Sequence, residues 1–177
     1  SLAIVSRYLH LLNDGLDFVV ETIGDFVHVR LDNAVVFPRA AEDFVALELG
    51  AAGLRVERHL FSWDGREFHN VVGTLDGSDP GRPWVVVGAH FDSTPSTPGA
   101  DDNASGVAAL LEIGRLLAGA RPAATVQLVG FNLEEIYHLW PPVFRIGSRA
   151  YVRLLKERGV RLAGAFVLEM VGFTGPR

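Results

Sequence analysis

From residue 84 onward, short β-branched apolar runs alternate with longer segments in which apolar residues recur at helical spacing. The runs predict strands at 84–89, 125–131 and 164–170, the first of which reads as buried, and the longer segments predict helices at 104–118 and 147–158. This alternation of strand and helix builds a largely parallel sheet. We therefore expect this part of the chain to adopt an α/β fold.

The first part of the chain has a different pattern. Helical spacing predicts a weak helix at 6–12 and a stronger one at 38–52, and apolar runs predict strands at 54–61 and 68–75. We expect a single α/β domain over 1–177, with a helical lead-in at about 1–52 and a core at about 54–177.

Composition excludes several classes of site. Sixteen basic and 21 acidic residues give a net charge of −5, which disfavours nucleic acid as the main partner. Because cysteine is absent, disulfides are excluded and any metal ion has to be held by histidine and carboxylate groups. No apolar run is long enough to span a membrane, and no leader segment is found, so the sequence predicts no particular compartment.

Metal-binding residue types stand at the ends of three predicted strands. These are His90, the pair Glu134-Glu135, and Glu169. In α/β sheets, ligands bind beyond the carboxyl ends of the strands, so these side chains are expected to share one edge. The loop after His90 adds the adjacent carboxylates Asp101 and Asp102, which repel each other unless a cation lies nearby.

The donor types suit zinc, which binds imidazole nitrogen and carboxylate oxygen. The predicted ligands are His90, Asp102, Glu135 and Glu169. Two zinc ions commonly share one bridging carboxylate and activate a water molecule. Glu134, next to a ligand, is suited to act as the general base. Asp92 is expected to orient the His90 ring by accepting a proton from its far nitrogen.

Four motifs occur in a characteristic order: His90-Phe91-Asp92-Ser93, the stretch from Pro98 to Gly106, Glu134-Glu135, and Leu168-Glu169-Met170. Together they resemble the co-catalytic zinc aminopeptidase family. That family includes bacterial leucyl aminopeptidases, glutamate carboxypeptidases and, as a non-catalytic relative, the transferrin receptor. The similarity covers roughly residues 70–173, and the stretch from Pro98 to Gly106 is its most specific part.

The resemblance implies a three-layer α/β/α fold of the zinc-exopeptidase (phosphorylase/hydrolase-like) type, with a mostly parallel, mixed central sheet. It also implies a role for each residue. His90 and Glu169 bind the first zinc, Asp92 supports His90, Asp102 bridges both zinc ions, Glu135 binds the second, and Glu134 is the general base. The peptide bond between Asp102 and Asn103 is expected to be cis.

Two departures from the family pattern bear on these expectations. Position 169 is Glu where many of these enzymes have Asp, and a glutamate still reaches a metal ion. The family's last histidine ligand lies beyond the final predicted strand, whereas this sequence has no histidine after His138. The sequence is therefore expected to lack the last strands of the catalytic domain. His138 is a weak candidate substitute, and the role of Asp101 is left open.

The resulting hypothesis is a zinc-dependent exopeptidase that hydrolyses the N-terminal bond of peptide substrates. One alternative is a non-catalytic member of the same fold that binds partners or acts as a scaffold. A second is a single-zinc enzyme such as a glutaminyl cyclase, which the double-aspartate loop argues against. The sequence does not specify the substrate preference, the native metal or the oligomeric state. It also does not distinguish aminopeptidase from carboxypeptidase or dipeptidase activity.

Overall fold

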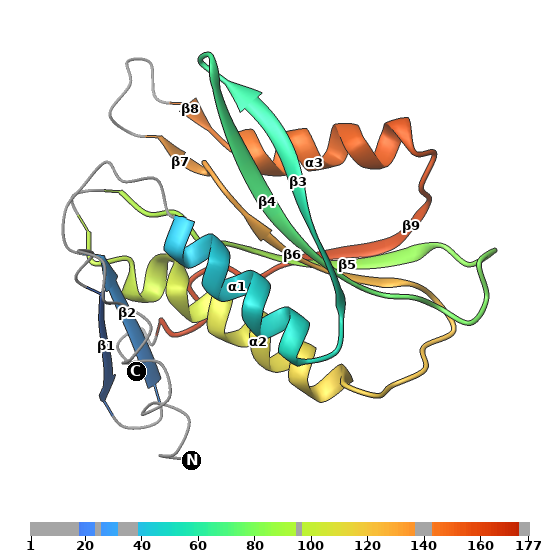
Figure 1. Ribbon diagram of the computed structural model, residues 1–177, viewed down its shortest axis with the longest axis horizontal. Helices are drawn as coiled ribbons and strands as arrows, with labels where there is room; N and C mark the ends of the chain where they lie inside the picture. Colours follow the sequence, from blue (N-terminus) through green and yellow to red (C-terminus); the bar gives the residue numbers. More distant parts are fainter. Residues whose placement is uncertain (1–17, 24–25, 32–38, 95–96, 137–142, 174–177) are drawn as a thin grey trace.

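The computed structural model describes residues 18–23, 26–31, 39–94, 97–136 and 143–173 (Figure 1). Its centre is a five-stranded sheet in the order β3-β4-β6-β5-β9. The strands are β3 (Arg55–Trp63), β4 (Arg66–Leu75), β5 (Trp84–His90), β6 (Val126–Phe131) and β9 (Leu162–Val167). β6, β5 and β9 are mutually parallel, whereas β4 is antiparallel to both of its neighbours. The predicted mixed, mostly parallel sheet is confirmed.

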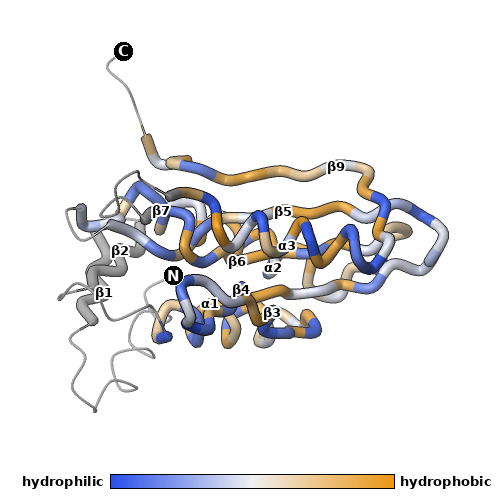
Figure 2. Tube along the Cα trace, turned by 90° about the horizontal axis from the view of Figure 1, so that it is seen from above, coloured by the Kyte–Doolittle hydropathy of each residue, from blue (hydrophilic) through white to orange (hydrophobic). Residues whose placement is uncertain are grey.

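Helices cover both faces of this sheet (Figures 1 and 2). They are α1 (Arg39–Ala51), α2 (Gly106–Leu117) and α3 (Ile146–Glu157). Neighbouring residues of a strand point to opposite faces. Thus Val71 of β4 packs in the core cluster with α1 and α2, while Val72 packs in a second cluster with Tyr151 of α3. The predicted three-layer arrangement is confirmed.

The predicted helical lead-in is wrong for the part of it that the structure describes before α1. There β1 (Phe18–Ile23) and β2 (Phe26–Leu31) form an antiparallel pair. Both segments are rich in β-branched residues, and the sequence between them is Gly-Asp, a composition typical of two-residue hairpins. The helix predicted at 6–12 lies outside the described residues.

Two irregular segments follow the ends of β5 and β6. A short helical turn, η2 (Ala100–Ser105), leads directly into α2. After β6, the two-residue strands β7 (Glu135–Ile136) and β8 (Val143–Phe144) pair with each other. These segments carry several of the predicted site residues. Among the described residues, no helix combines the length and apolar character needed to cross a membrane.

Candidate metal centre

The three neighbouring strands β6, β5 and β9 deliver the predicted ligands to one edge of the sheet. Ligand atoms of His90, Asp102 and Glu135 all lie within 4.8 Å of one another. His90 Nε2 lies 3.1 Å from Asp102 Oδ1 and 3.2 Å from Glu169 Oε1. The structure thus brings together all four residues that the sequence predicted as ligands. His138 lies outside the described residues.

The charges of this cluster favour a bound cation. Three carboxylates close to one another repel unless a positive charge lies among them. Burial lowers the pKa of His90, but the carboxylates of Asp92 and Glu169 raise it more, to about 10. His90 is therefore the compensating cation when no metal is bound. One imidazole nitrogen with several carboxylate oxygens is a donor set that fits zinc.

Asp92 contacts the site differently from the sequence expectation. Its backbone carbonyl oxygen, and not its carboxylate, is the closer partner of His90 Nδ1, at 3.0 Å against 3.7 Å for Oδ1. Asp92 Oδ2 accepts hydrogen bonds from the backbone N–H groups of Glu134 at 2.8 Å and Glu135 at 2.9 Å. Asp92 therefore joins the end of β5 to the loop that carries two other predicted site residues.

Asn103 ties the aspartate loop to the end of β9. Its buried side-chain amide donates to the Leu168 carbonyl at 2.8 Å, and its Oδ1 accepts from the backbone N–H groups of Gly106 and Met170. These bonds hold the residues on either side of Glu169 next to the loop of Asp102. The peptide bond between Asp102 and Asn103 is cis, as the resemblance implied. The sequence pattern did not single out this tethering role of Asn103.

Asp101 is engaged outside the ligand cluster. Its Oδ1 accepts hydrogen bonds from the Ser105 hydroxyl and from the Gly172 backbone N–H, both at 3.0 Å. Only Asp102 of the adjacent pair contacts His90 among the described interactions. The question that the sequence left open is thereby answered: Asp101 anchors the start of η2 and the segment after β9.

Glu134 is held by a residue that sequence reasoning missed. Its Oε1 accepts a hydrogen bond from the Ser148 backbone N–H at 2.7 Å, and its Oε2 accepts one from the Ser148 hydroxyl at 2.8 Å. Burial raises the pKa of Glu134, and the two bonds from Ser148 oppose this shift. A serine at the start of a predicted helix was the available signal, because serine commonly bonds there.

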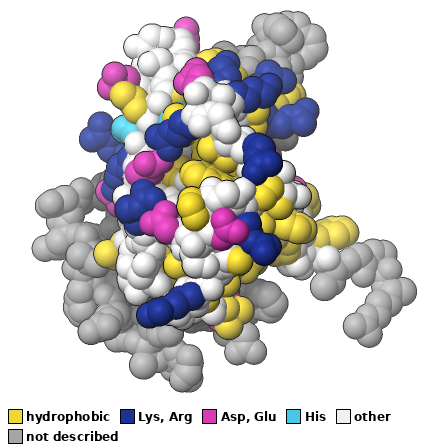
Figure 3. All heavy atoms as spheres, turned by 90° about the vertical axis from the view of Figure 1, so that its right-hand side faces the viewer, with side chains coloured by type: hydrophobic (Ala, Val, Ile, Leu, Met, Phe, Trp, Pro, Cys, Tyr) yellow, Lys and Arg dark blue, Asp and Glu magenta, His cyan; other side chains and the backbone are white. Residues whose placement is uncertain are grey.

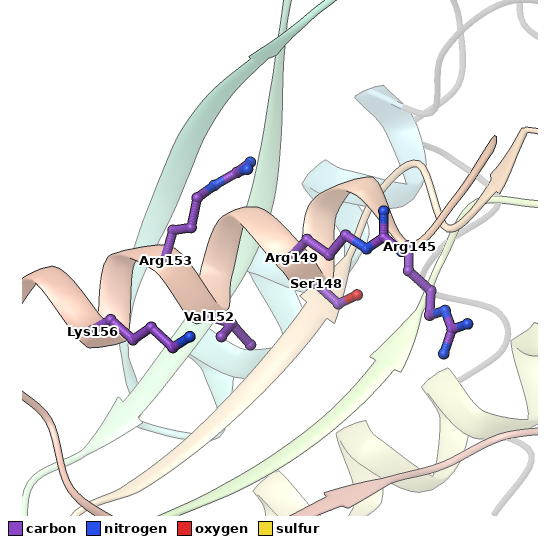
Figure 4. Close-up of a pocket in the computed structure, with 6 residues that line it drawn as sticks. All are labelled: Arg145, Ser148, Arg149, Val152, Arg153 and Lys156. Carbon is purple, nitrogen blue, oxygen red and sulfur yellow. The ribbon is translucent and has the colours of Figure 1, made fainter.

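Ser148 also borders a surface pocket of about 490 Å³ on the outer side of α3 (Figure 4). The other lining residues are Arg145, Arg149, Val152, Arg153 and Lys156. This basic, open pocket is separate from the carboxylate cluster. Ser148 connects the two regions, because it lines the pocket and also bonds to Glu134. The start of α3 therefore lies beside the candidate metal centre.

Comparisons with known proteins point to one family. The profile of peptidase family M28 matches residues 70–177. The Escherichia coli uncharacterized protein YfbL is 37% identical over 183 residues, which cover 97% of this chain and 53% of that protein. The structure is similar to Porphyromonas gingivalis glutaminyl cyclase (27% identity, TM-score 0.64, 75% of this chain and 50% of that chain). It is also similar to BSAP, a zinc aminopeptidase from Bacillus subtilis (31% identity, TM-score 0.50, 62% and 26%).

The chain spans about half or less of the length of these proteins. The matched region nevertheless contains every residue of the candidate metal centre described above.

Proposed function

Because this chain belongs to peptidase family M28, we propose that it forms the metal site of a zinc-dependent exopeptidase that hydrolyses the N-terminal bond of peptides. The observation that carries the proposal is the convergence of His90, Asp102 and Glu135 within 4.8 Å, with Glu169 also in contact with His90. The zinc aminopeptidase from Bacillus subtilis supports the choice of metal and reaction.

The proposed ligands would serve two zinc positions. His90 and Glu169 would hold the first ion, Glu135 the second, and Asp102 both. Bound zinc supplies Lewis-acid chemistry, which lowers the pKa of a water molecule and polarises a carbonyl group. Asp92 fixes the position of His90 and of the backbone of the Glu134-Glu135 pair through hydrogen bonds.

Glu134 is proposed to move the proton. It would accept a proton from the attacking water as the oxygen bonds to the peptide carbonyl carbon. It would then donate that proton to the departing amine as the carbon–nitrogen bond breaks. Hydrolysis balances, because the hydroxyl group stays with the acid product and the proton with the amine.

The first experiment measures zinc per chain after dialysis, and hydrolysis of leucyl-p-nitroanilide on the same sample. Two zinc ions per chain with turnover would support the proposal, whereas one ion or none is expected if the site needs the histidine ligand that this sequence lacks after His138. E134Q is expected to retain zinc and to lower kcat by about 10²- to 10⁴-fold, because it removes the proton carrier but no ligand. An active E134Q variant would exclude the base role, and a wild-type protein without turnover would favour a binding or scaffold function.

The similarity to a glutaminyl cyclase supports a second candidate function. In that reaction the N-terminal amine of a glutaminyl peptide attacks its own side-chain amide and releases ammonia, so no water is consumed. Mass spectrometry of a glutaminyl peptide separates the two functions. Hydrolysis releases free glutamine, whereas cyclisation leaves a peptide lighter by one ammonia, and a single zinc ion per chain would accompany the second result.

A further inference from the structure

The first turn of α3 is bonded to the residues that directly follow β6. The first N–H groups of a helix lack acceptors within the helix and need partners elsewhere. For residues 146, 147 and 148 these partners are, in order, the Leu133 carbonyl at 3.0 Å, the Asn132 carbonyl at 3.1 Å and Glu134 Oε1 at 2.7 Å. Three successive donors of the helix therefore bind three successive residues, 132–134, which we call the site loop.

Gly147 sets how closely these two segments approach. A Cβ atom at this position would lie 2.1 Å from the Asn132 carbonyl oxygen and 2.5 Å from Asn70 Oδ1. Only glycine fits this contact without displacing the backbone. Asn70 is fully buried and also binds both sides, accepting from the Asn132 N–H and donating to the Gly147 carbonyl. Gly147 and Asn70 thus fix the distance from α3 to the loop independently of the Ser148 side chain.

At this distance Ser148 reaches both oxygens of Glu134, one through its backbone and the other through its hydroxyl. A glutamate side chain has several rotatable bonds, and two donors on the two oxygens fix the plane of its carboxylate. Each oxygen keeps a second lone pair that can accept a proton. Figure 4 shows Ser148 near the start of α3, between Arg149 and Arg145.

We propose that Ser148 is a positioning residue that holds the carboxylate of Glu134 in the orientation needed for proton transfer. The inference rests on the proposed function, because it assigns Ser148 a role through the proposed general base. A purely structural role would make Ser148 a stabiliser of the α3 start. In that case its loss would lower stability without any specific effect on kcat.

The kinetic test uses S148A and S148T with E134Q as reference. S148A keeps the backbone bond and loses the hydroxyl bond, so kcat for leucyl-p-nitroanilide is expected to fall about tenfold, as for one hydrogen bond to a charged group. KM is expected to stay within about twofold, because no substrate contact is removed. S148T retains a hydroxyl and is expected to recover most of kcat.

A double-mutant cycle separates the two roles. If Ser148 acts through Glu134, adding S148A to E134Q leaves the residual activity unchanged. An equal loss in both backgrounds would overturn the inference, as would an unchanged kcat in S148A. Zinc content and melting temperature of S148A are expected to match the wild type, and S148C, which also lacks the hydroxyl, replaces S148A if S148A does not fold.

A second readout needs no turnover. A crystal structure of zinc-loaded S148A is expected to show the Glu134 carboxylate rotated or in more than one conformer, with α3 unmoved. A Glu134 carboxylate in its wild-type place would overturn the inference. Absence of hydrolysis by the wild type would instead count against the proposed function, so the two failures are distinguishable.

Discussion

Asp92 contacts the candidate site through two different groups. Its backbone carbonyl lies beside His90, and its carboxylate accepts two backbone N–H bonds from the loop after β6. Its other carboxylate oxygen is buried and has no hydrogen-bond partner among the described residues. Partners behind a ligand commonly determine how well a metal is held. Asp92 is such a partner for two ligands at once.

D92A is therefore expected to weaken zinc binding by about 10- to 100-fold, since both His90 and Glu135 lose a fixed position. Competition with a chromogenic chelator measures this affinity. D76A is the matched control, because Asp76 forms only an exposed ion pair with Arg55, far from the ligand set. Equal zinc affinity in D92A and wild type would contradict the role given to Asp92.

The proposed ligands and their neighbour Asp92 could be singled out from the sequence, whereas Ser148 and Asn103 could not. All four proposed ligands have suitable chemistry: His90, Glu135 and Glu169 stand at or next to predicted strand ends, and Asp102 stands in the loop after His90. Ser148 and Asn103 act through bonds to residues 14 and 65 positions away in the chain. Such bonds depend on how elements pack, which local spacing does not report.

At the scale of elements, β3 contacts α3 through the side chain of His59. The ring of His59 on β3 lies 6.2 Å from the ring of Tyr151 on α3, measured between centroids. Its Nδ1 lies 3.2 Å from the amide nitrogen of Asn70, which donates to it when the ring is neutral. Burial lowers the pKa of His59, and Arg158 lowers it further, against the opposite effects of Glu57 and Glu157.

This shift predicts a pH-dependent stability. As the pH falls, the unfolded chain takes up the His59 proton near 6.5, the ordinary pKa of histidine, before the folded chain does. The contribution of His59 is thus complete above that pH and is lost as the pH falls toward the lowered folded pKa. H59Q keeps an acceptor for Asn70 but does not titrate. Urea unfolding at pH 7.5 and 5.0 is expected to show a smaller loss of stability for H59Q than for wild type, and equal losses would contradict the assignment.

Most elements from α1 onward could be predicted because each has a local signature. Helical spacing identified α1 and α3 to within two residues at either end, and β-branched runs identified β5 and β6. The order β3-β4-β6-β5-β9 could not be predicted, because strand pairing is decided by contacts between distant segments. The hairpin of β1 and β2 contradicts the predicted helical lead-in, because short apolar runs do not by themselves distinguish a strand from a buried helix.

At the scale of the whole molecule, β9 lies at an edge of the sheet and is apolar and exposed. Phe166 is 61% exposed and Val167 67%, and Phe173 beyond the strand is 68% exposed. Figure 3 shows apolar side chains gathered in the middle of one face, between acidic and basic groups. Exposed apolar strand edges favour association with other chains.

The 177-residue chain is therefore expected to self-associate as its concentration rises. F166K places a charge on this edge and is expected to increase the monomer fraction, measured by size-exclusion chromatography with light scattering. L116K is the control, since Leu116 on α2 is 75% exposed but lies away from the sheet edge. The same monomer fraction for wild type and F166K would contradict a role for β9 in association.

The bonds between the first turn of α3 and residues 132–134 have a consequence for hydrogen exchange. The amide hydrogens of residues 146, 147 and 148 are each bonded to a group of the site loop. They can exchange with solvent deuterium only while those bonds are open. The exchange rates of these three backbone amides therefore report the free energy of separating α3 from residues 132–134, and the measurement needs no substrate.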